Sequence, residues 1–300
     1  MADNVKIKVL CPVCHNSDAD VLYEPWNVLD DPERLYGAAS GVPGTQRLVR
    51  CSCGMIYESP RYADDVILKG YMSSLESGHD SQYPMRVDSF FRALKRLEDK
   101  LPAPGARVLD IGTAGGAFLD AATRFGYRAT GMEPSRDLVE RGAARGLDIH
   151  QGTIDSHDFA PGTFDMITLW DVIEHLTDPA GALVKIRELL KPDGVLLINF
   201  PDIGTTQAKL AGKKFWWILS VHLYHFSRPT MDKLCANAGY EVFSFTRYWQ
   251  TLQFGYLEEM AIHYRLPLAK LLTRLTPKFI REIPVPYYAS QTTAIARIRK

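Results

Sequence analysis

The spacing of apolar side chains changes along the chain, and each spacing predicts a different kind of element. Between residues 61 and 104 the apolar positions recur at helical intervals, and "PAPG" at 102–105 then breaks the pattern. The face of this expected helix is formed by Phe90, Phe91, Leu94, Leu97 and Leu101. From residue 105 onwards, short apolar runs of strand length alternate with further helical patterns. That alternation predicts an α/β fold with a mostly parallel sheet covered by helices on both faces.

Seven apolar runs are expected to be strands. They are residues 107–112, 127–133, 147–152, 164–170, 195–200, 240–249 and 292–300. One of the intervening helices is expected to start at Asp178 and Pro179, because these residue types favour a helix cap and first turn. It would carry Leu183, Ile186 and Leu190 on its apolar face.

The first 60 residues differ from the rest, since they hold four of the five cysteines and little helical periodicity. The fifth cysteine, Cys235, lies on a helical apolar face and is expected in the core. We therefore expect three parts: a small module over 1–60, a helical connector over 61–104, and an α/β domain over 105–300.

Charge and composition exclude several classes of function. The 35 lysine and arginine residues balance the 35 aspartate and glutamate residues, so nothing suggests nucleic-acid binding. No apolar run is long enough to span a membrane, and the polar start "MADNVKIKVL" is unlike a signal peptide. We expect a cytoplasmic protein whose cysteines are reduced thiols or metal ligands.

The stretch "LDIGTAGGAF", residues 109–118, carries three glycines between an expected strand and an expected helix. Their spacing does not fit the G-x-G-x-x-G pattern of dinucleotide sites. Asp110 precedes the first glycine, where its carboxylate would repel a pyrophosphate but favour a sulfonium or ammonium group. Glu133 ends the next strand, where a carboxylate typically accepts ribose hydroxyls. The residues therefore favour S-adenosylmethionine as ligand; the simpler alternative for Asp110 is a turn or helix cap.

Four motifs, "VLDIGTAGGAF", "GMEPS", "GTFDMITLWDVIEHLTDP" and "LLKPDGVLLINFPD", resemble in order and spacing those of class I S-adenosylmethionine-dependent methyltransferases. The resemblance implies a Rossmann-like, seven-stranded, mostly parallel sheet whose final strand is antiparallel, with a cofactor cleft at the carboxyl ends of the strands. Ala114 departs from the middle glycine of the family motif. The implied cofactor contacts are Asp110, Gly112, Thr113, Gly116, Glu133, Pro134, Thr153, Ile154, Trp170 and Asp171.

The cysteines in "CPVCH" and "RCSCGMIYESPR" look like two halves of a zinc ribbon. Cys11, Cys14, Cys51 and Cys53 would supply the four ligands of a structural zinc. The pattern is similar to the zinc-binding domain that precedes the methyltransferase domain in a bacterial subfamily of sugar C-methyltransferases and of polysaccharide and natural-product enzymes. The second pair is C-x-C where C-x-x-C is usual, so two alternatives stay open: His15 replaces Cys51, or the ribbon holds no metal.

Methyl transfer from a sulfonium needs positioning above all, plus a base where the acceptor carries a proton. The stretch "VHLYHFS" follows an aromatic patch and matches an H-x-x-x-F-S pattern frequent in the subfamily. His222 is therefore the first candidate for the base, with Tyr224 and His225 next. The alternative is that these side chains anchor the loop or stack on substrate.

A second cluster lies in "DVIEH", which is similar to the E-x-x-E-H pattern of ubiquinone-pathway and small-RNA O-methyltransferases. In those families the pattern binds a divalent metal that coordinates a vicinal diol or catechol. Asp171, Glu174 and His175 could do the same here, since aspartate can still bind magnesium. The alternative is that the pair Glu174 and His175 supports the cofactor pocket, as in many relatives without metal.

Three functions compete on this basis. The leading one is methyl transfer to a small molecule such as a sugar, a natural product or a lipid-linked intermediate. The second is metal-assisted O-methylation of a quinone-like or phenolic substrate. The third is a zinc-ribbon binding protein with an inactive methyltransferase domain, which the intact Asp110 and Glu133 disfavour.

Residues 263–286 resemble a basic amphipathic helix inserted before the final strand. Its apolar positions are Leu268, Leu271, Leu272, Leu275 and Phe279. Its basic positions are Arg265, Lys270, Arg274, Lys278 and Arg281, opposed by Glu282 alone. Such a helix could pack on its own domain, cover the cleft, form a homodimer, or lie on an anionic membrane surface.

Overall fold

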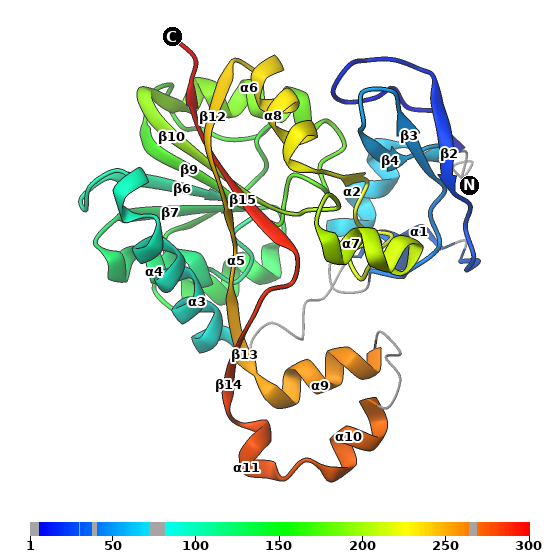
Figure 1. The fold of residues 1–300 in the computed structure, drawn as a ribbon. Coiled ribbons are helices and arrows are strands. Elements are labelled where there is room, and N and C mark those ends of the chain that lie inside the picture. Colours follow the sequence, from blue (N-terminus) through cyan, green and yellow to red (C-terminus); the bar gives the residue numbers. More distant parts are fainter. Residues whose placement is uncertain (1–5, 30, 38–40, 73–81, 264–268) are drawn as a thin grey trace.

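The computed structural model describes residues 6–29, 31–37, 41–72, 82–263 and 269–300, which form three connected parts (Figure 1). A large sheet with helices on both faces forms the body. A small sheet lies beside the body, and a helical lobe extends from the body. In these described ranges, no helix has the length and apolar content needed to cross a bilayer.

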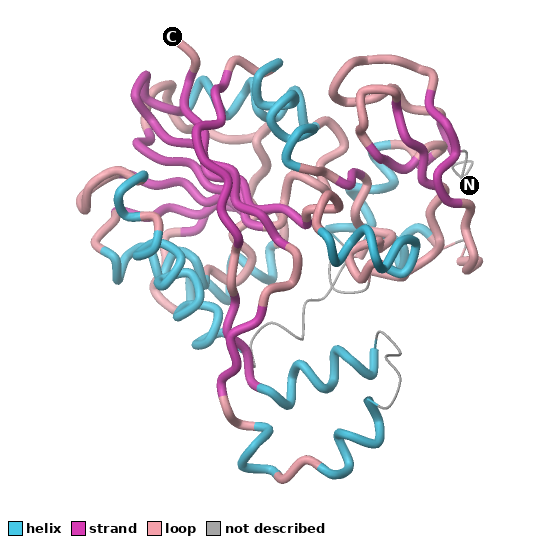
Figure 2. The backbone as a smooth tube through the Cα atoms, viewed as in Figure 1, coloured by secondary structure: helices cyan, strands magenta, loops and turns pink. Residues whose placement is uncertain are grey.

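Within the described part of the chain, the large sheet has seven strands in the order β12-β15-β10-β9-β6-β7-β8. Figure 2 shows the strands of the body in magenta with helices in cyan around them. The seven strands are β6 (Arg107–Ile111), β7 (Arg128–Glu133), β8 (Ile149–Gln151), β9 (Phe164–Trp170), β10 (Leu190–Pro201), β12 (Tyr240–Arg247) and β15 (Gln291–Ile298). The pairs among β6 to β10 are parallel, whereas β15 runs antiparallel to both β10 and β12. The predicted Rossmann-like sheet with an antiparallel final strand is therefore confirmed.

Alternate residues of the central strands face opposite helical layers, as the two-residue period of a strand requires. Val108 and Met166 are buried against α3 and α4, while Leu109 and Ile167 are buried on the face that α6 and α8 cover. The helices around the sheet are α3 (Tyr83–Arg96), α4 (Ala117–Phe125), α5 (Arg136–Ala144), α6 (Pro179–Leu189) and α8 (Arg228–Asn237). The apolar face predicted for α3 packs into this core as expected.

The start of α6 was predicted correctly, but its end was not. The Asp178 carboxylate accepts the Gly181 N–H at 2.9 Å and so caps the helix, with Pro179 in its first turn. The helix ends at Leu189, and Leu190 already pairs with Phe164 as the first residue of β10. The expected strand start at residue 195 is therefore wrong. The strand begins five residues earlier, because Leu190 already pairs with β9, and a register shift then separates this pair from the regular pairing that starts at Val195.

The small antiparallel sheet combines distant parts of the chain in the order β11-β4-β3-β2. Three of its strands come from the cysteine-rich segment, and the fourth, β11, comes from the stretch that carries the candidate base. We call residues 6–62 the N-terminal module. Its elements and the helix that follows are β1 (Lys6–Ile7), β2 (Ala19–Tyr23), α1 (Pro32–Tyr36), β3 (Leu48–Cys51), β4 (Ile56–Glu58), β5 (Arg61–Tyr62) and α2 (Asp64–Met72), and β11 is Tyr224–His225.

The lobe extends from the end of β12 through a two-stranded ladder, β13 with β14 (Figure 1). Its elements are β13 (Gln250–Gln253), α9 (Phe254–His263), α10 (Ala269–Leu275), α11 (Lys278–Arg281) and β14 (Pro284–Tyr287). The single amphipathic helix expected over 263–286 is therefore wrong, because Pro277 cannot continue α10 and instead precedes α11. Arg265 and Leu268 lie outside the described residues. The remaining short helices are η2 (Glu98–Lys100), α7 (Thr206–Ala211) and η3 (Gly212–Lys214).

Candidate functional site

Two adjoining cavities open at the carboxyl ends of β6, β7 and β9, where ligands bind in open α/β sheets. The first measures about 340 Å³ and the second about 280 Å³. Both are lined by Gly112, Val172 and His175, so these residues mark the junction. A ligand with two chemically different ends could occupy both cavities.

The glycine loop between β6 and α4 forms part of the wall of the first cavity. Gly112 has a φ of +68°, and a Cβ there would lie 2.6 Å from Val172 Cγ2. Gly116 has a φ of +86°, and a Cβ there would collide with the Leu147 side chain. Both positions therefore require glycine. Ala114, at the position where the family motif has its middle glycine, adopts a φ of +49°, a left-handed conformation that strains an alanine.

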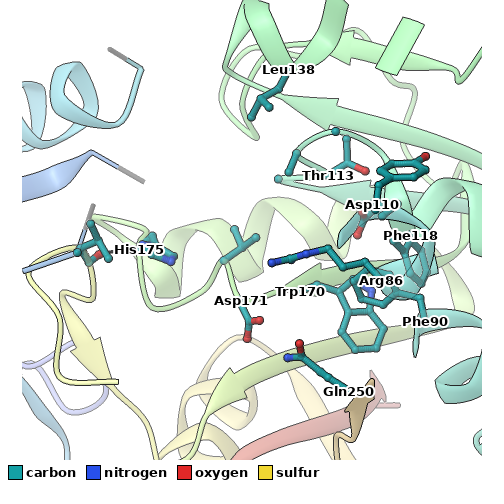
Figure 3. A pocket seen from close by; sticks show the side chains of 18 of the residues that line it. Arg86, Phe90, Asp110, Thr113, Phe118, Leu138, Trp170, Asp171, His175 and Gln250 are labelled. Atoms are coloured by element: carbon teal, nitrogen blue, oxygen red, sulfur yellow. Dashed lines mark hydrogen bonds between the residues drawn. The ribbon is translucent and has the colours of Figure 1, made fainter. Parts of the chain in front are cut away.

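Asp110 is the residue before the last in β6 and lines the first cavity (Figure 3). Its side chain is buried, and Oδ1 accepts a hydrogen bond from Thr168 Oγ1 at 2.6 Å. Burial raises the pKa of this carboxyl to about 7. A cationic ligand group in the cavity would favour the ionised form and lower that pKa again.

Glu133 is fully buried at the end of β7. Its Oε2 accepts the Ala114 N–H at 3.0 Å and its Oε1 accepts the Ser135 N–H at 2.9 Å. Glu133 therefore holds the glycine loop, and it is not among the residues that line either cavity. Its contact with ribose hydroxyls stays a prediction.

The second cavity contains the residues expected at the adenine end. Pro134, Thr153 and Ile154 line it, together with Ile111 and Met132. The Thr153 hydroxyl accepts the Asp155 N–H at 3.2 Å, so it also orders the turn that follows β8. The mainly apolar walls suit a flat aromatic base.

Trp170 and Asp171 line the first cavity, as does Thr113 (Figure 3). Asp171 has a φ of +56°, and its carboxylate accepts the side-chain amides of Asn199 at 2.8 Å and Gln291 at 2.6 Å. These amides hold the carboxylate in the wall of the cavity. Asp171 does not belong to the cluster of possible metal ligands described below, so the hypothesis that it is a metal ligand finds no geometric support.

Arg86 was not predicted from the sequence as a site residue. Its guanidinium projects from α3 into the first cavity, beside Trp170 and Asp171 (Figure 3). Its charge lowers the pKa of Asp171, which burial raises to about 6. An arginine here suits a carboxylate on a ligand. Its place in a helical pattern, outside any glycine or acidic motif, offered no signal.

His222 lines the first cavity and is buried. Its Nδ1 lies 2.8 Å from the Trp217 carbonyl oxygen, which can only accept, so Nδ1 carries the proton and Nε2 is left as an acceptor. Burial, with the nearby charges of His175 and His225, lowers the pKa of His222 well below its usual value. The ring is therefore neutral at physiological pH.

Tyr224 and His225 lie on β11 and are buried, and neither is among the cavity-lining residues. The Tyr224 hydroxyl donates to the Thr177 carbonyl at 3.0 Å. Their catalytic roles remain predictions, whereas the structure brings His222 to the cavity.

Glu174, His175 and His222 bring one ligating atom each within 4.8 Å of the others. His175 Nδ1 lies 2.9 Å from the Val221 carbonyl oxygen, so His175 also keeps Nε2 as an acceptor. Both carboxylate oxygens of Glu174 are buried without a hydrogen-bond partner among the described residues. Burial and the charge of Asp171 raise the pKa of Glu174. A buried carboxyl and two oriented imidazoles form a donor set that fits a divalent metal.

The four cysteines of the N-terminal module also meet. The Cys11 and Cys53 sulfurs are 3.5 Å apart, the Cys14 and Cys51 sulfurs are 3.3 Å apart, and all four lie within 4.8 Å of one another. Cys51 belongs to this cluster despite the C-x-C spacing, and His15 does not. Four converging thiols fit a structural zinc. Cys235 is buried in the core, as expected.

Comparisons with known proteins agree with this geometry. A family model described as a methyltransferase domain matches residues 79–244, more than half of the chain. The ubiquinone biosynthesis O-methyltransferase of Xanthomonas campestris is 32% identical over 107 residues, which cover 33% of this chain and 45% of that protein. The chain thus spans about half the length of the curated relatives it matches.

Two solved structures share the fold. A chain from the complex of the Haloferax volcanii Trm112 methyltransferase activator with a candidate methyltransferase has a TM-score of 0.51 at 17% identity, covering 75% of this chain and 95% of that one. A candidate methyltransferase of Bacillus halodurans has a TM-score of 0.50 at 17% identity, covering 70% of this chain and 99% of that one. With the family match, the chain belongs to the class I S-adenosylmethionine-dependent methyltransferases.

Proposed function

We propose that this protein transfers a methyl group from S-adenosylmethionine to a small-molecule acceptor. The observation that carries the proposal is the pair of adjoining cavities, one mainly apolar and one lined by Asp110 and Arg86. The adenosine part would occupy the second cavity. The methionine part would enter the first, where the carboxylate of Asp110 faces a cation and the guanidinium of Arg86 faces a carboxylate.

The acceptor would occupy the rest of the first cavity, next to His222. Its nucleophilic atom forms a bond to the methyl carbon while the methyl–sulfur bond breaks and the electron pair stays on sulfur. His222 Nε2 would take the acceptor proton, because Nδ1 is already committed to the Trp217 carbonyl. Sugars, natural products and lipid-linked intermediates are the acceptor classes that the sequence resemblance favours.

Calorimetry with S-adenosylhomocysteine tests the cofactor assignment. Asp110→Asn should weaken binding by roughly ten- to a hundredfold, because it removes a charged partner. Arg136→Gln on exposed α5 is the control and should bind normally. If the wild-type protein does not bind S-adenosylhomocysteine, the alternative hypothesis of a zinc-ribbon binding protein with an inactive methyltransferase domain is favoured instead.

A second candidate function is metal-assisted O-methylation, and the cluster of Glu174, His175 and His222 specifically favours it. Bound there, a divalent metal would lower the pKa of an acceptor hydroxyl that it coordinates. Two imidazoles with one carboxylate suit a transition metal better than magnesium, which prefers oxygen ligands. The relatives named as ubiquinone biosynthesis O-methyltransferases point towards a quinone-like or phenolic acceptor.

Metal analysis separates this candidate from the first. In the metal-assisted case, Glu174→Gln should lose one metal equivalent and most of the turnover while the cysteine-bound metal remains. In the metal-free case, the metal content should be unchanged, and His222→Ala should reduce turnover by about 10²–10⁴ with little change in cofactor affinity.

The cysteine cluster would hold a structural zinc in the N-terminal module, in keeping with the zinc-ribbon resemblance. This zinc would stabilise the module and would take no part in methyl transfer. About one zinc per chain, removed only by strong chelation, is the expected result of elemental analysis.

A further inference from the structure

The part of the lobe formed by α10 and α11 exposes several large apolar side chains that are close in sequence. They are Leu271, Leu272 and Leu275 on α10, Phe279 on α11 and Ile283 just beyond it. Leu275 and Phe279, four residues apart in the sequence, are each 70% exposed, and exposed apolar side chains that gather in this way often mark an interaction surface. The helices are short and lie at the end of the lobe that is farthest from the large sheet (Figure 1).

Positive charge accompanies this group. Arg274 and Lys278 are exposed beside Leu275 and Phe279, and they have no acidic partner among the described residues. Arg281 contacts Glu258 at 3.1 Å and Glu259 at 3.4 Å. Within residues 269–283 the single acidic residue is Glu282, which is exposed at the end of α11, so the two cations Arg274 and Lys278 outnumber it. The outer surface is therefore apolar and cationic.

The structure argues against two other ways of covering this surface. The lobe does not fold its apolar side chains back onto the body, since they are exposed. A two-fold dimer would place the same patch on both sides, so Arg274 and Lys278 of one copy would lie against a patch that is itself cationic, with Glu282 alone to oppose them. An anionic lipid surface could cover both the apolar side chains and the cations, because its boundary accepts apolar groups and its charge attracts lysine and arginine.

We propose that the tip of the lobe, formed by α10 and α11, docks on an anionic membrane surface. Leu275 and Phe279 enter the boundary between headgroups and acyl chains, and Arg274 and Lys278 lie at the headgroup phosphates. If the proposed function holds, this docking also has a consequence for the acceptor. Tyr256 and Met260, on α9 of the same lobe, line the first cavity, so docking would hold that cavity near lipid-linked acceptors.

Vesicle sedimentation tests this docking without measuring methyl transfer, so its failure is distinguishable from failure of the proposed function. The full-length protein should pellet with phosphatidylcholine vesicles that contain phosphatidylglycerol, and should be released by high salt. It should not pellet with phosphatidylcholine alone. Arg274→Gln with Lys278→Gln should lower the partition coefficient roughly tenfold or more. Leu275→Asp with Phe279→Asp should abolish pelleting.

A matched control lies on α6, where Val184 and Lys185 are also exposed. Val184→Asp with Lys185→Gln should pellet like the wild type. Circular dichroism and thermal unfolding establish that each variant is folded. The proposal is overturned if the wild type stays in solution with anionic vesicles at low salt, or if the α6 control loses binding as much as the tip variants. It is also overturned if light scattering finds a dimer that Leu275→Asp with Phe279→Asp dissociates.

Discussion

The N-terminal module and the lobe both adjoin the first cavity, but they are joined to the body in different ways. The module supplies β4 as the partner of β11 and contacts the loop that carries His222. Gln46 Nε2 donates to the His222 carbonyl at 2.8 Å and lies 3.3 Å from the Ser220 carbonyl oxygen. The Glu58 N–H donates to the Leu223 carbonyl at 2.9 Å.

The lobe is attached to the body at its base, where Thr251 of β13 exchanges hydrogen bonds with Ser89 and accepts one from Arg92 of α3. It connects through β13 and β14, and its helices are held mainly to one another, with Glu258 binding both Thr276 and Arg281. Its contribution to the cavity is a set of side chains, including Tyr256 and Met260. The difference indicates that the module fixes the geometry of the candidate base, whereas the lobe shapes the acceptor end and presents an outer surface.

Disrupting the cysteine cluster should have the largest effect. Cys53→Ser removes one of four converging thiols, and structural zinc sites contribute about 10–16 kcal/mol of metal binding. We expect loss of zinc, a clearly lower melting temperature and little remaining turnover. Cys51→Ser should cause the same loss of zinc, melting temperature and turnover, because Cys51 rather than His15 belongs to the cluster. Elemental analysis and thermal unfolding measure both.

The control for this variant is Cys235→Ala, which removes a buried thiol far from the cluster in sequence and should leave the zinc content unchanged. A Cys53→Ser protein that keeps both its melting temperature and its turnover would mean that the module does not support the active-site loop.

Gln46→Met should have the next largest effect. The methionine fills a similar volume but leaves the His222 carbonyl without its donor, and an unsatisfied buried carbonyl costs about 1–3 kcal/mol. If Gln46 positions the loop, turnover should fall by roughly tenfold or more while cofactor affinity stays constant. Gln207→Met, at an exposed position on α7, is the control. Equal losses in turnover and cofactor affinity would instead indicate general destabilisation.

The sequence predicted the parts of the site that depend on local patterns. The mostly parallel sheet and the loop from Asp110 to Gly116 follow from strand runs, glycine spacing and one acidic residue, whereas the order of the strands was not predicted. Contacts between distant segments could not be predicted in this way. Gln46 lies 176 residues from His222 and reaches it only because β11 joins the small sheet. Arg86 likewise enters the cavity only through the packing of α3.

The cofactor pocket between these two regions should respond to pH. Burial raises the pKa of Asp110 to about 7, and a cationic cofactor requires the ionised carboxylate. Protonation therefore competes with binding as the pH falls. The dissociation constant for S-adenosylmethionine should rise about tenfold between pH 8 and pH 6. Calorimetry at several pH values measures this, and Asp110→Asn should bind weakly with a much flatter pH profile. A flat wild-type profile would contradict the role of Asp110.

Substitutions at the tip of the lobe should have the smallest effect on the isolated protein. Leu275→Asp with Phe279→Asp replaces side chains that are 70% exposed and make few packing contacts to lose. Surface changes of this kind usually alter stability by about 0.5 kcal/mol or less. The melting temperature, zinc content and cofactor affinity should therefore match the wild type, and turnover of a water-soluble acceptor should be unchanged. A large drop in cofactor affinity would show that the tip is coupled to the cavity through α9 as tightly as the N-terminal module is through β11, and the contrast between the two regions would be lost.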